Sequence, residues 1–196
     1  MAGILVVCTG NICRSPMAEA FLRAALERRL GQEAPPVRSA GVIGRPGGPA
    51  MEESIRAAAE RGADISEHVV TRLDARSIAE ADLIVTMAVE HRVEVSNAVP
   101  AASPKTFTLK ELVRLLERRP APPGPFDLAA VVAEAERLRR SGVAGNTHDE
   151  DVVDPLGMPY ESYRAVAWEL DEWSDRLAAV LAGHERSRAP AGIEGE

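Results

Sequence analysis

Cysteine, histidine and aromatic residues are all scarce in this chain. Only two of its 196 residues are cysteines, Cys8 and Cys13, and both fall in one short stretch near the start. Two neighbouring cysteines cannot form the disulfide framework of a small secreted protein. The four histidines are His68, His91, His148 and His184. Their scatter lacks the spacing of metal ligands, so we expect no metal site and no cofactor.

Long apolar runs and an excess of positive charge are also missing. The first residues have no basic region followed by an apolar stretch, and no run is long enough to span a membrane. The net charge is −7, which disfavours nucleic acid and anionic membranes as partners. We therefore expect a cytoplasmic protein that binds neither. A hydrophobic content of 45% supports one substantial core, and the oligomeric state is not indicated.

Short apolar runs alternate with segments that favour helix. The pattern predicts strands at residues 4–7, 37–40, 82–87 and 105–108, and helices at 16–30, 50–61, 74–80, 89–98, 109–118, 128–140 and 160–181. This alternation predicts an α/β fold, with a four-stranded parallel twisted sheet and helices on both faces. Ligands of such sheets bind at the carboxyl ends of the strands.

The most informative stretch joins the first strand to the first helix. It reads Cys8-Thr9-Gly10-Asn11-Ile12-Cys13-Arg14-Ser15-Pro16. Backbone N–H groups at a helix N-terminus form an oxyanion site, and Gly10 and Asn11 tolerate the left-handed backbone that such a loop needs. These donors and Arg14 favour a thiolate at Cys8, and Ser15 can donate a hydrogen bond to its sulfur. The Arg14 fork can hold two phosphate oxygens.

Residues 9–15 are therefore predicted to bind phosphate, and Cys8 to accept a phosphoryl group. The alternative is a structural cysteine beside an ordinary turn. The stretch closely resembles the signature loop of the low-molecular-weight protein tyrosine phosphatases, because every position from Cys8 to Pro16 fits that pattern. The resemblance implies the strand order 2-1-3-4. It also implies a protein phosphatase that needs no metal, acts on phosphorylated proteins and passes through a phosphocysteine.

The resemblance covers most of the chain and divides it into regions. Residues 1–183 form a single phosphatase domain in this interpretation, with a probable insertion at about residues 119–147 and a flexible tail at residues 184–196. The Pro-rich start of the insertion and its polar end predict a solvated excursion. A lid or a surface for a partner is the alternative.

A second stretch lies just before the last predicted helix. It reads Asp151-Val152-Val153-Asp154-Pro155-Leu156-Gly157. The family carries an Asp-Pro general acid at this place, so the resemblance assigns that role to Asp154 and leaves Asp151 aside. Departure of an alkoxide or phenoxide needs a proton donor, and neither stretch contains a histidine that could serve.

Three further residues, Ser39, Cys13 and His68, receive roles around the loop. The segment that begins at Ser39 matches one that lies beside the active loop in the family, which suggests a hydrogen bond from Ser39 to Asn11. An ordinary serine at a strand end fits equally well. Cys13 is predicted to form a reversible disulfide with Cys8 under peroxide, with simple packing behind the loop as the alternative. His68 resembles a family histidine, and we expect it to pack and hydrogen-bond rather than act as a base.

Residue 12 bears on which phosphorylated side chain enters. An apolar Ile12 in the rim favours a flat aromatic ring, whereas a related branch that resembles bacterial protein arginine phosphatases carries Thr there. Phosphotyrosine is therefore the predicted substrate. Phosphoarginine is the alternative, because Leu156 and Gly157 replace a common aromatic pair and residues 107–111 look like the arginine branch.

Other activities fit the sequence less well. Arsenate reduction on this fold needs two further cysteines, and a phosphocarrier with a phosphorylated cysteine generally lacks the arginine and the Asp-Pro acid. A binding module without catalysis has no need to keep Cys8, Arg14 and Asp154 together.

Overall fold

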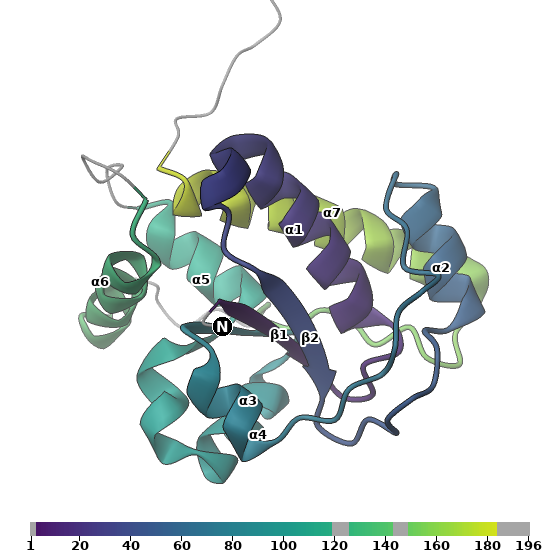
Figure 1. The fold of residues 1–196 in the computed structure, drawn as a ribbon, viewed down its shortest axis with the longest axis horizontal. Helices are drawn as coiled ribbons and strands as arrows, with labels where there is room; N and C mark the ends of the chain where they lie inside the picture. The colour runs from purple at the N-terminus through teal and green to yellow at the C-terminus, as the bar shows by residue number, and fades with distance from the viewer. Residues whose placement is uncertain (1–2, 119–125, 143–148, 184–196) are drawn as a thin grey trace, which may run out of the picture.

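The computed structural model describes residues 3–118, 126–142 and 149–183 (Figure 1). The tail expected at residues 184–196 lies outside the described residues, as do residues 119–125 and 143–147 of the expected insertion.

A four-stranded parallel sheet forms the centre of the molecule. Its strands are β1 (Ile4–Cys8), β2 (Val37–Gly41), β3 (Leu83–Thr86) and β4 (Thr106–Thr108), in the order β2-β1-β3-β4. The predicted fold class and strand order are therefore confirmed. Cys8, the last residue of β1, pairs with Gly41 of β2, and Val7 pairs with Thr86 of β3. Strands β2, β1 and β3 thus end side by side.

Helices cover both faces of the sheet. They are α1 (Arg14–Leu30), α2 (Glu52–Ala59), α3 (Ala75–Glu80), α4 (Val89–Ala98), α5 (Leu109–Leu116), α6 (Leu128–Arg140) and α7 (Tyr160–Leu181). Figure 1 shows α1, α2, α5 and α7 on one side of the sheet and α3 and α4 on the other. Each helix was predicted, although α2 is shorter than expected and α1 begins earlier, at Arg14. Pro16 is tolerated inside the first turn of α1, because the N–H groups there have no partner within the helix.

Two short 3-10 helices were not predicted. One, Gly31–Glu33, follows α1, and the other, Pro100–Lys105, follows α4. Lys105 therefore lies before β4 rather than in it.

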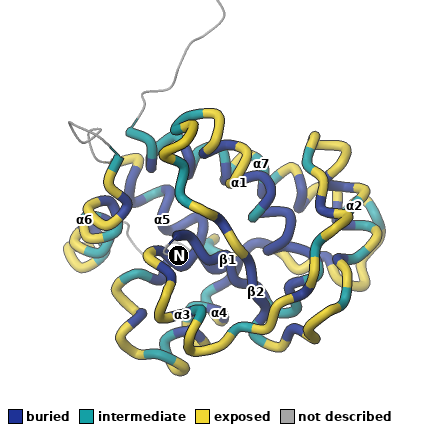
Figure 2. Tube along the Cα trace, in the orientation of Figure 1, coloured by how far each residue is buried: buried dark blue, intermediate teal, exposed yellow. Residues whose placement is uncertain are grey.

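The apolar run of β1 is buried on both faces, as the dark trace in Figure 2 shows. Ile4, Val6 and Cys8 belong to the core shared with α1, α5 and α7, whereas Leu5 and Val7 belong to the core under α3 and α4. This two-sided burial explains why β1 is continuously apolar rather than alternating.

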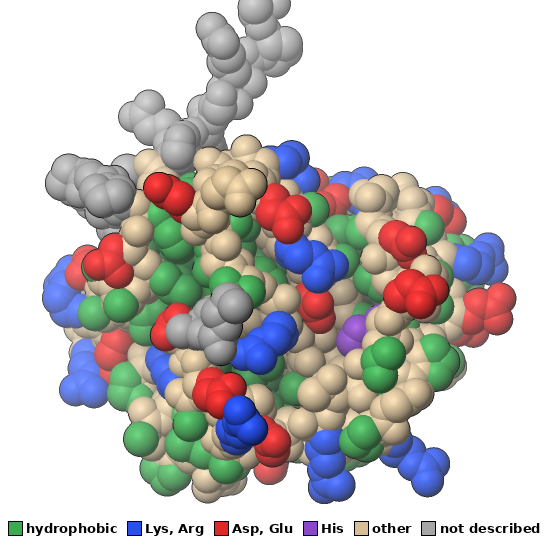
Figure 3. All heavy atoms as spheres, in the orientation of Figure 1, with side chains coloured by type: hydrophobic (Ala, Val, Ile, Leu, Met, Phe, Trp, Pro, Cys, Tyr) green, Lys and Arg blue, Asp and Glu red, His purple; other side chains and the backbone are tan. Residues whose placement is uncertain are grey.

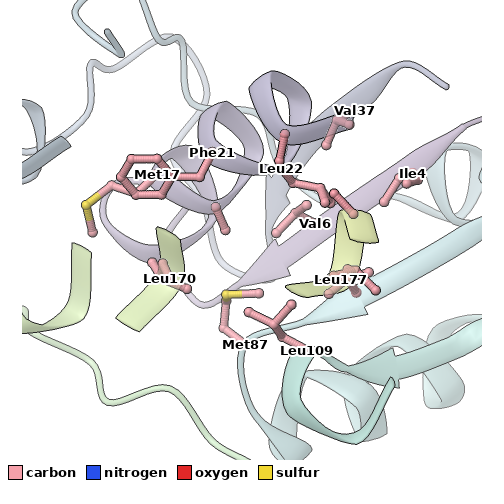
Figure 4. Packing of buried hydrophobic residues seen from close by; sticks show 14 of the residues in the cluster. Ile4, Val6, Met17, Phe21, Leu22, Val37, Met87, Leu109, Leu170 and Leu177 are labelled. Atoms are coloured by element: carbon pink, nitrogen blue, oxygen red, sulfur yellow. The ribbon is translucent and has the colours of Figure 1, made fainter. Parts of the chain in front are cut away.

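The larger core lies between the sheet and the pair α1 and α7. Met17 and Phe21 of α1 point toward Leu170 of α7, beside Val6 of β1 (Figure 4). The predicted apolar stripe of the last helix is Tyr160, Tyr163, Val166, Ala167, Leu170, Trp173, Leu177, Val180 and Leu181, and each of its members is buried or packed against this core. The aromatic residues of this stripe therefore serve mainly in packing.

Helix α6 lies in the region expected to be an insertion, and it is packed rather than solvated. It packs against α5 and against the 3-10 helix before β4. Its apolar face buries Leu128, Val131, Ala135 and Leu138. Arg139 donates to the carbonyl of Thr106 at 2.8 Å and stacks over the Phe107 ring at 4.2 Å. Helix α6 thus covers part of the β4 edge of the sheet, which would otherwise present unpaired carbonyls.

Acidic and basic side chains are interspersed on the face seen in Figure 3. Within the part of the chain that the structure describes, no helix is long and apolar enough to cross a membrane.

Candidate active site

The residues between β1 and α1 form a tight loop that is held by Asn11. Asn11 is fully buried and has a φ of 55°, so it adopts the left-handed backbone that the sequence predicted. Gly10, the other residue that tolerates a left-handed backbone, does not adopt it. The Asn11 amide donates to the hydroxyls of Ser15 at 2.9 Å and Ser39 at 2.8 Å, and its oxygen accepts from the N–H of Thr71 at 2.8 Å. One side chain therefore joins the loop, its helix and two neighbouring segments.

Three neighbouring residues, Gly41, Ser39 and His68, support the loop from outside. A Cβ on Gly41 would lie 2.7 Å from the backbone of Gly10 and Asn11, so only glycine allows β2 to approach the loop this closely. Ser39 makes the hydrogen bond to Asn11 that the resemblance suggested, and its own hydroxyl donates to Glu19 at 2.6 Å. His68 contacts the carbonyl of Asn11 at 2.9 Å, in line with a hydrogen-bonding role.

The thiol of Cys8 lies at the base of this loop. The side chain is 2% exposed. Its sulfur accepts from the N–H of Asn11 at 3.3 Å and lies 3.0 Å from the hydroxyl of Ser15. The sulfur also sits at the carboxyl end of β1, next to the first turn of α1. A negative sulfur in this position is stabilised by hydrogen bonds and by the helix dipole.

Arg14 brings together the loop and the segment before α7. The guanidinium donates to the hydroxyl of Thr9 at 3.0 Å, to the carbonyl of Val152 at 3.0 Å and to a carboxylate oxygen of Asp154 at 2.5 Å. The side chain of Arg14 is only 4% exposed, whereas that of Asp154 is 40% exposed. The structure therefore joins the two predicted stretches, which are far apart in the sequence, through a charged pair at the mouth of the site.

Asp151 and Asp154 have clearly different surroundings. The Asp151 carboxylate accepts from the N–H of Val89 at 2.8 Å, at the first turn of α4. The Asp154 carboxylate faces Arg14 and also accepts from the N–H of Leu156 at 3.2 Å. The Asp151 carboxylate thus caps the N-terminus of α4, and the Asp154 carboxylate is the one that faces the phosphate-binding loop.

The segment that carries Asp154 is anchored by Met87, beyond β3, and by Lys110 of α5. The N–H of Val152 donates to the carbonyl of Met87 at 2.8 Å, beyond the end of β3. Lys110 of α5 is buried and donates to the carbonyl of Asp151 at 2.8 Å. Lys110 also pairs with Asp149 at 2.8 Å and with Glu169 at 2.7 Å.

The remaining predicted residues lie around the loop. Cys13 is buried behind it, and burial raises the pKa of its thiol to about 11. Both Cys8 and Cys13 are free thiols. Ile12 is half-buried, packs against the core and accepts from the N–H of Met51 at 2.8 Å through its carbonyl.

Sequence reasoning missed His91 and Lys110. His91 lies 2.9 Å from the Thr9 hydroxyl, and Lys110 holds the segment of Asp154. One signal was available for His91. It follows β3 closely, β3 is the neighbour of β1, and residues beyond the carboxyl ends of adjacent parallel strands meet at one edge.

Known proteins share this arrangement. Residues 3–122 match the family model described as low molecular weight phosphotyrosine protein phosphatase. A protein-arginine-phosphatase of Bacillus subtilis is 32% identical over 184 residues, which cover 93% of this chain and 99% of that protein. A low molecular weight protein-tyrosine-phosphatase of Acinetobacter johnsonii is 39% identical over 106 residues, which cover 54% of this chain and 70% of that protein.

Solved structures agree with these sequence matches. A variant of the arginine phosphatase YwlE with a phosphorylated active-site serine has a TM-score of 0.68 at 30% identity, covering 91% of this chain and 93% of that one. The fold, the loop geometry and the matches over more than half of the chain lead to one conclusion. This chain belongs to the low molecular weight phosphotyrosine protein phosphatase family.

Proposed function

We propose that this chain hydrolyses phosphotyrosine in proteins through a phosphocysteine on Cys8. The observation that carries the proposal is the convergence of the Cys8 sulfur, the Arg14 guanidinium and the Asp154 carboxylate at the carboxyl edge of the sheet. A nucleophile, an anion clamp and a proton donor are the parts that phosphoryl transfer from an ester requires.

In the first step, the Cys8 sulfur attacks phosphorus in line with the phenolic oxygen. The sulfur–phosphorus bond forms as the phosphorus–oxygen bond breaks, and the electron pair leaves with the phenol. The backbone N–H groups of residues 9–15 and the fork of Arg14 hold the three other oxygens. Asp154 gives its proton to the departing oxygen, since the charge of the bound phosphate favours the protonated carboxyl.

In the second step, the Asp154 carboxylate takes a proton from a water molecule, which attacks the phosphocysteine. The sulfur leaves as a thiolate and inorganic phosphate is released. Ser15, 3.0 Å from the sulfur, donates a hydrogen bond to the thiolate in this proposal. The phosphorylated active-site serine of the YwlE variant supports a covalent phosphate at the corresponding place.

Turnover of an aryl phosphate, with and without a metal chelator, tests this proposal. We expect the same rate in both conditions. Cys8→Ser should abolish turnover yet still bind vanadate, because the hydroxyl is a far weaker nucleophile in an unchanged cradle. Arg14→Ala should lose both binding and rate. Hydrolysis by Cys8→Ser close to the wild-type rate would remove Cys8 as the nucleophile.

Phosphoarginine is the second candidate substrate, and one observation favours it. The arginine phosphatase of Bacillus subtilis aligns with 93% of this chain, whereas the tyrosine phosphatase of Acinetobacter johnsonii aligns with 54%. Ile12 favours phosphotyrosine, because its apolar side chain lies half-buried on the loop itself, beside Gly10. We give more weight to Ile12, because residues in contact with the substrate decide specificity more directly than overall similarity does.

The two substrates are separated by kcat/KM on phosphotyrosine and phosphoarginine peptides of the same sequence. We expect the wild type to prefer phosphotyrosine, and Ile12→Thr to shift the ratio toward phosphoarginine. Ile12→Val serves as the control, because it keeps the branched apolar character. A wild type that prefers phosphoarginine, or a ratio that Ile12→Thr leaves unchanged, would defeat the assignment to phosphotyrosine.

We extend the proposal to the setting of the enzyme. Residues 1–183 act as one phosphatase domain on phosphorylated proteins in the cytoplasm. The compartment is supported by the chemistry, because a mechanism that depends on a free thiol needs reducing conditions.

A further inference from the structure

One buried histidine has no place in the motifs or in the proposed mechanism. His91 lies on α4, is 2% exposed, and its Nδ1 has no hydrogen-bond partner. A buried polar atom without a partner destabilises a fold, so an apolar side chain would serve better if the position required only packing. The other ring nitrogen, Nε2, lies 2.9 Å from the hydroxyl oxygen of Thr9.

The same hydroxyl oxygen is bound to the catalytic arginine. Arg14 donates to Thr9 Oγ1 at 3.0 Å through the Nη2 that also donates to Asp154. A guanidinium can only donate, so the oxygen of Thr9 must be the acceptor from Arg14. The single hydrogen of the hydroxyl remains available to His91 Nε2, which accepts it when the ring proton is on Nδ1. With that tautomer, the contacts form a directed chain from the guanidinium through Thr9 to the imidazole.

The surroundings of His91 keep it able to accept. Burial and the charge of Arg14 lower its pKa to about 4, whereas Asp151 and Asp154 act in the opposite direction. Glu90, on the same helix, places a carboxylate oxygen 3.4 Å from Nε2, and its negative charge opposes the lowering of the pKa. Burial is the largest influence on the pKa, so His91 is neutral at neutral pH, and its Nε2 has a free lone pair when the proton is on Nδ1.

We propose that His91 is a positioning residue that accepts the Thr9 hydroxyl hydrogen and thereby fixes Arg14 in the orientation that grips phosphate. The inference rests on the proposed function, since it gives a role to a residue that supports the same site. His91 touches neither the substrate nor the reacting atoms, and it acts only through Thr9. The proposal requires the tautomer with hydrogen on Nδ1.

Kinetics and phosphate binding test the chain of contacts. We expect His91→Leu and Thr9→Val each to lower kcat/KM by about tenfold and to weaken inorganic phosphate binding by a similar factor, the order expected for one hydrogen bond to a charged group. The double variant should lose no more than either single variant, because both break one chain. His91→Gln and Thr9→Ser, which restore an acceptor and a hydroxyl, should recover most of the loss. Glu94→Gln, at an exposed position on the same helix, is the matched control and should leave both values unchanged.

A spectroscopic measurement tests the tautomer independently of turnover. In a nitrogen-15 NMR spectrum of the wild type, His91 should show a protonated Nδ1 and an unprotonated Nε2, and Thr9→Val should shift the Nε2 signal. A proton on Nε2, additive losses in the double variant, or wild-type phosphate binding by Thr9→Val would overturn the proposal. A wild type that binds phosphate with this tautomer but hydrolyses no phosphoester would instead contradict the proposed function, so the two failures are distinguishable.

Discussion

At the scale of single residues, the proposed mechanism depends on the difference between Asp151 and Asp154. Asp154→Ala should slow hydrolysis of substrates with poor leaving groups by about 10²–10⁴-fold, the usual worth of general acid catalysis, and slow activated aryl phosphates much less. The measurement is kcat over a series of phosphates that differ in leaving-group basicity.

Asp151→Ala is the matched control for this prediction. Its carboxylate accepts from the N–H of Val89, so the substitution should cost about 1 kcal/mol of stability as a lost helix cap and affect all substrates alike. If Asp151→Ala shows the dependence on leaving group and Asp154→Ala does not, the general acid has been assigned to the wrong residue.

Cys13 allows a second prediction at this scale. Peroxide should oxidise Cys8 to a sulfenic acid, and the Cys13 thiolate should then attack that sulfur and release water, which leaves a disulfide that reductant reverses. Because burial raises the pKa of Cys13 to about 11, we expect disulfide formation to accelerate as the pH rises. Peptide mapping after oxidation measures the products. Irreversible sulfinic Cys8 beside a free Cys13 at every pH would show that Cys13 only packs behind the loop.

At the scale of elements, α5 serves the site as well as the core. Lys110→Met should free the segment of Asp154, because it removes the bonds to the Asp151 carbonyl and to Glu169. We expect kcat to fall more for poor leaving groups than for activated ones, with stability reduced by about 1–3 kcal/mol. Lys105→Met, at the chain's other lysine, removes bonds to carbonyls of α3 and of the residue after it. It should lower stability without this dependence, and the same pattern in both variants would argue against a role for Lys110 in the site.

The secondary structure elements were predictable because each leaves a local signal. Continuous apolar runs predicted β1 and β3, and the helical stripe of α7 was recognisable over its whole length. The 3-10 helix at Pro100–Lys105 left no such signal, because two prolines and small residues read as a loop. The packing of α6 depends on which elements its apolar face contacts, here α5 and the 3-10 helix before β4. The sequence of the helix alone does not identify those partners.

The candidate site was predictable to the extent that it is contiguous in the chain or resembles a known motif. Cys8, Arg14 and Asp154 were found in this way. The sequence indicated that either Gly10 or Asn11 could take the left-handed backbone. The structure shows that Asn11 takes it, and the hydrogen bonds of its side chain to Ser39 and Thr71 hold it there. His91 and Lys110 act through contacts between distant elements, so only the structure identifies them.

At the scale of the whole molecule, His91 links the site to stability. Its pKa is about 4 in the folded protein, against the ordinary value of 6.5 for a histidine side chain, so between these values the unfolded chain binds more protons. Stability should therefore be complete above pH 6.5 and fall as the pH drops toward 4, by about 3 kcal/mol from this group.

Denaturant unfolding between pH 4 and pH 7 measures this dependence. His91→Leu should flatten the curve, because the residue that titrates is gone. His68→Leu is the control, since it removes another histidine that contacts the loop between β1 and α1 but is less buried than His91. A wild-type curve that His91→Leu leaves unchanged would show that carboxylates alone determine the acid sensitivity.

The contact between Arg14 and Asp154 has a consequence for selectivity among anions. Asp154 is a tethered competitor for the guanidinium, present at a high effective concentration because it belongs to the same chain. Chloride and simple carboxylates carry one charge and offer little advantage over it, whereas a phosphate monoester carries two charges and also fills the backbone cradle. We therefore expect Asp154 itself to exclude abundant weak anions from Arg14. Removal of the competitor by Asp154→Ala should tighten the binding of inorganic phosphate even as it slows the chemistry.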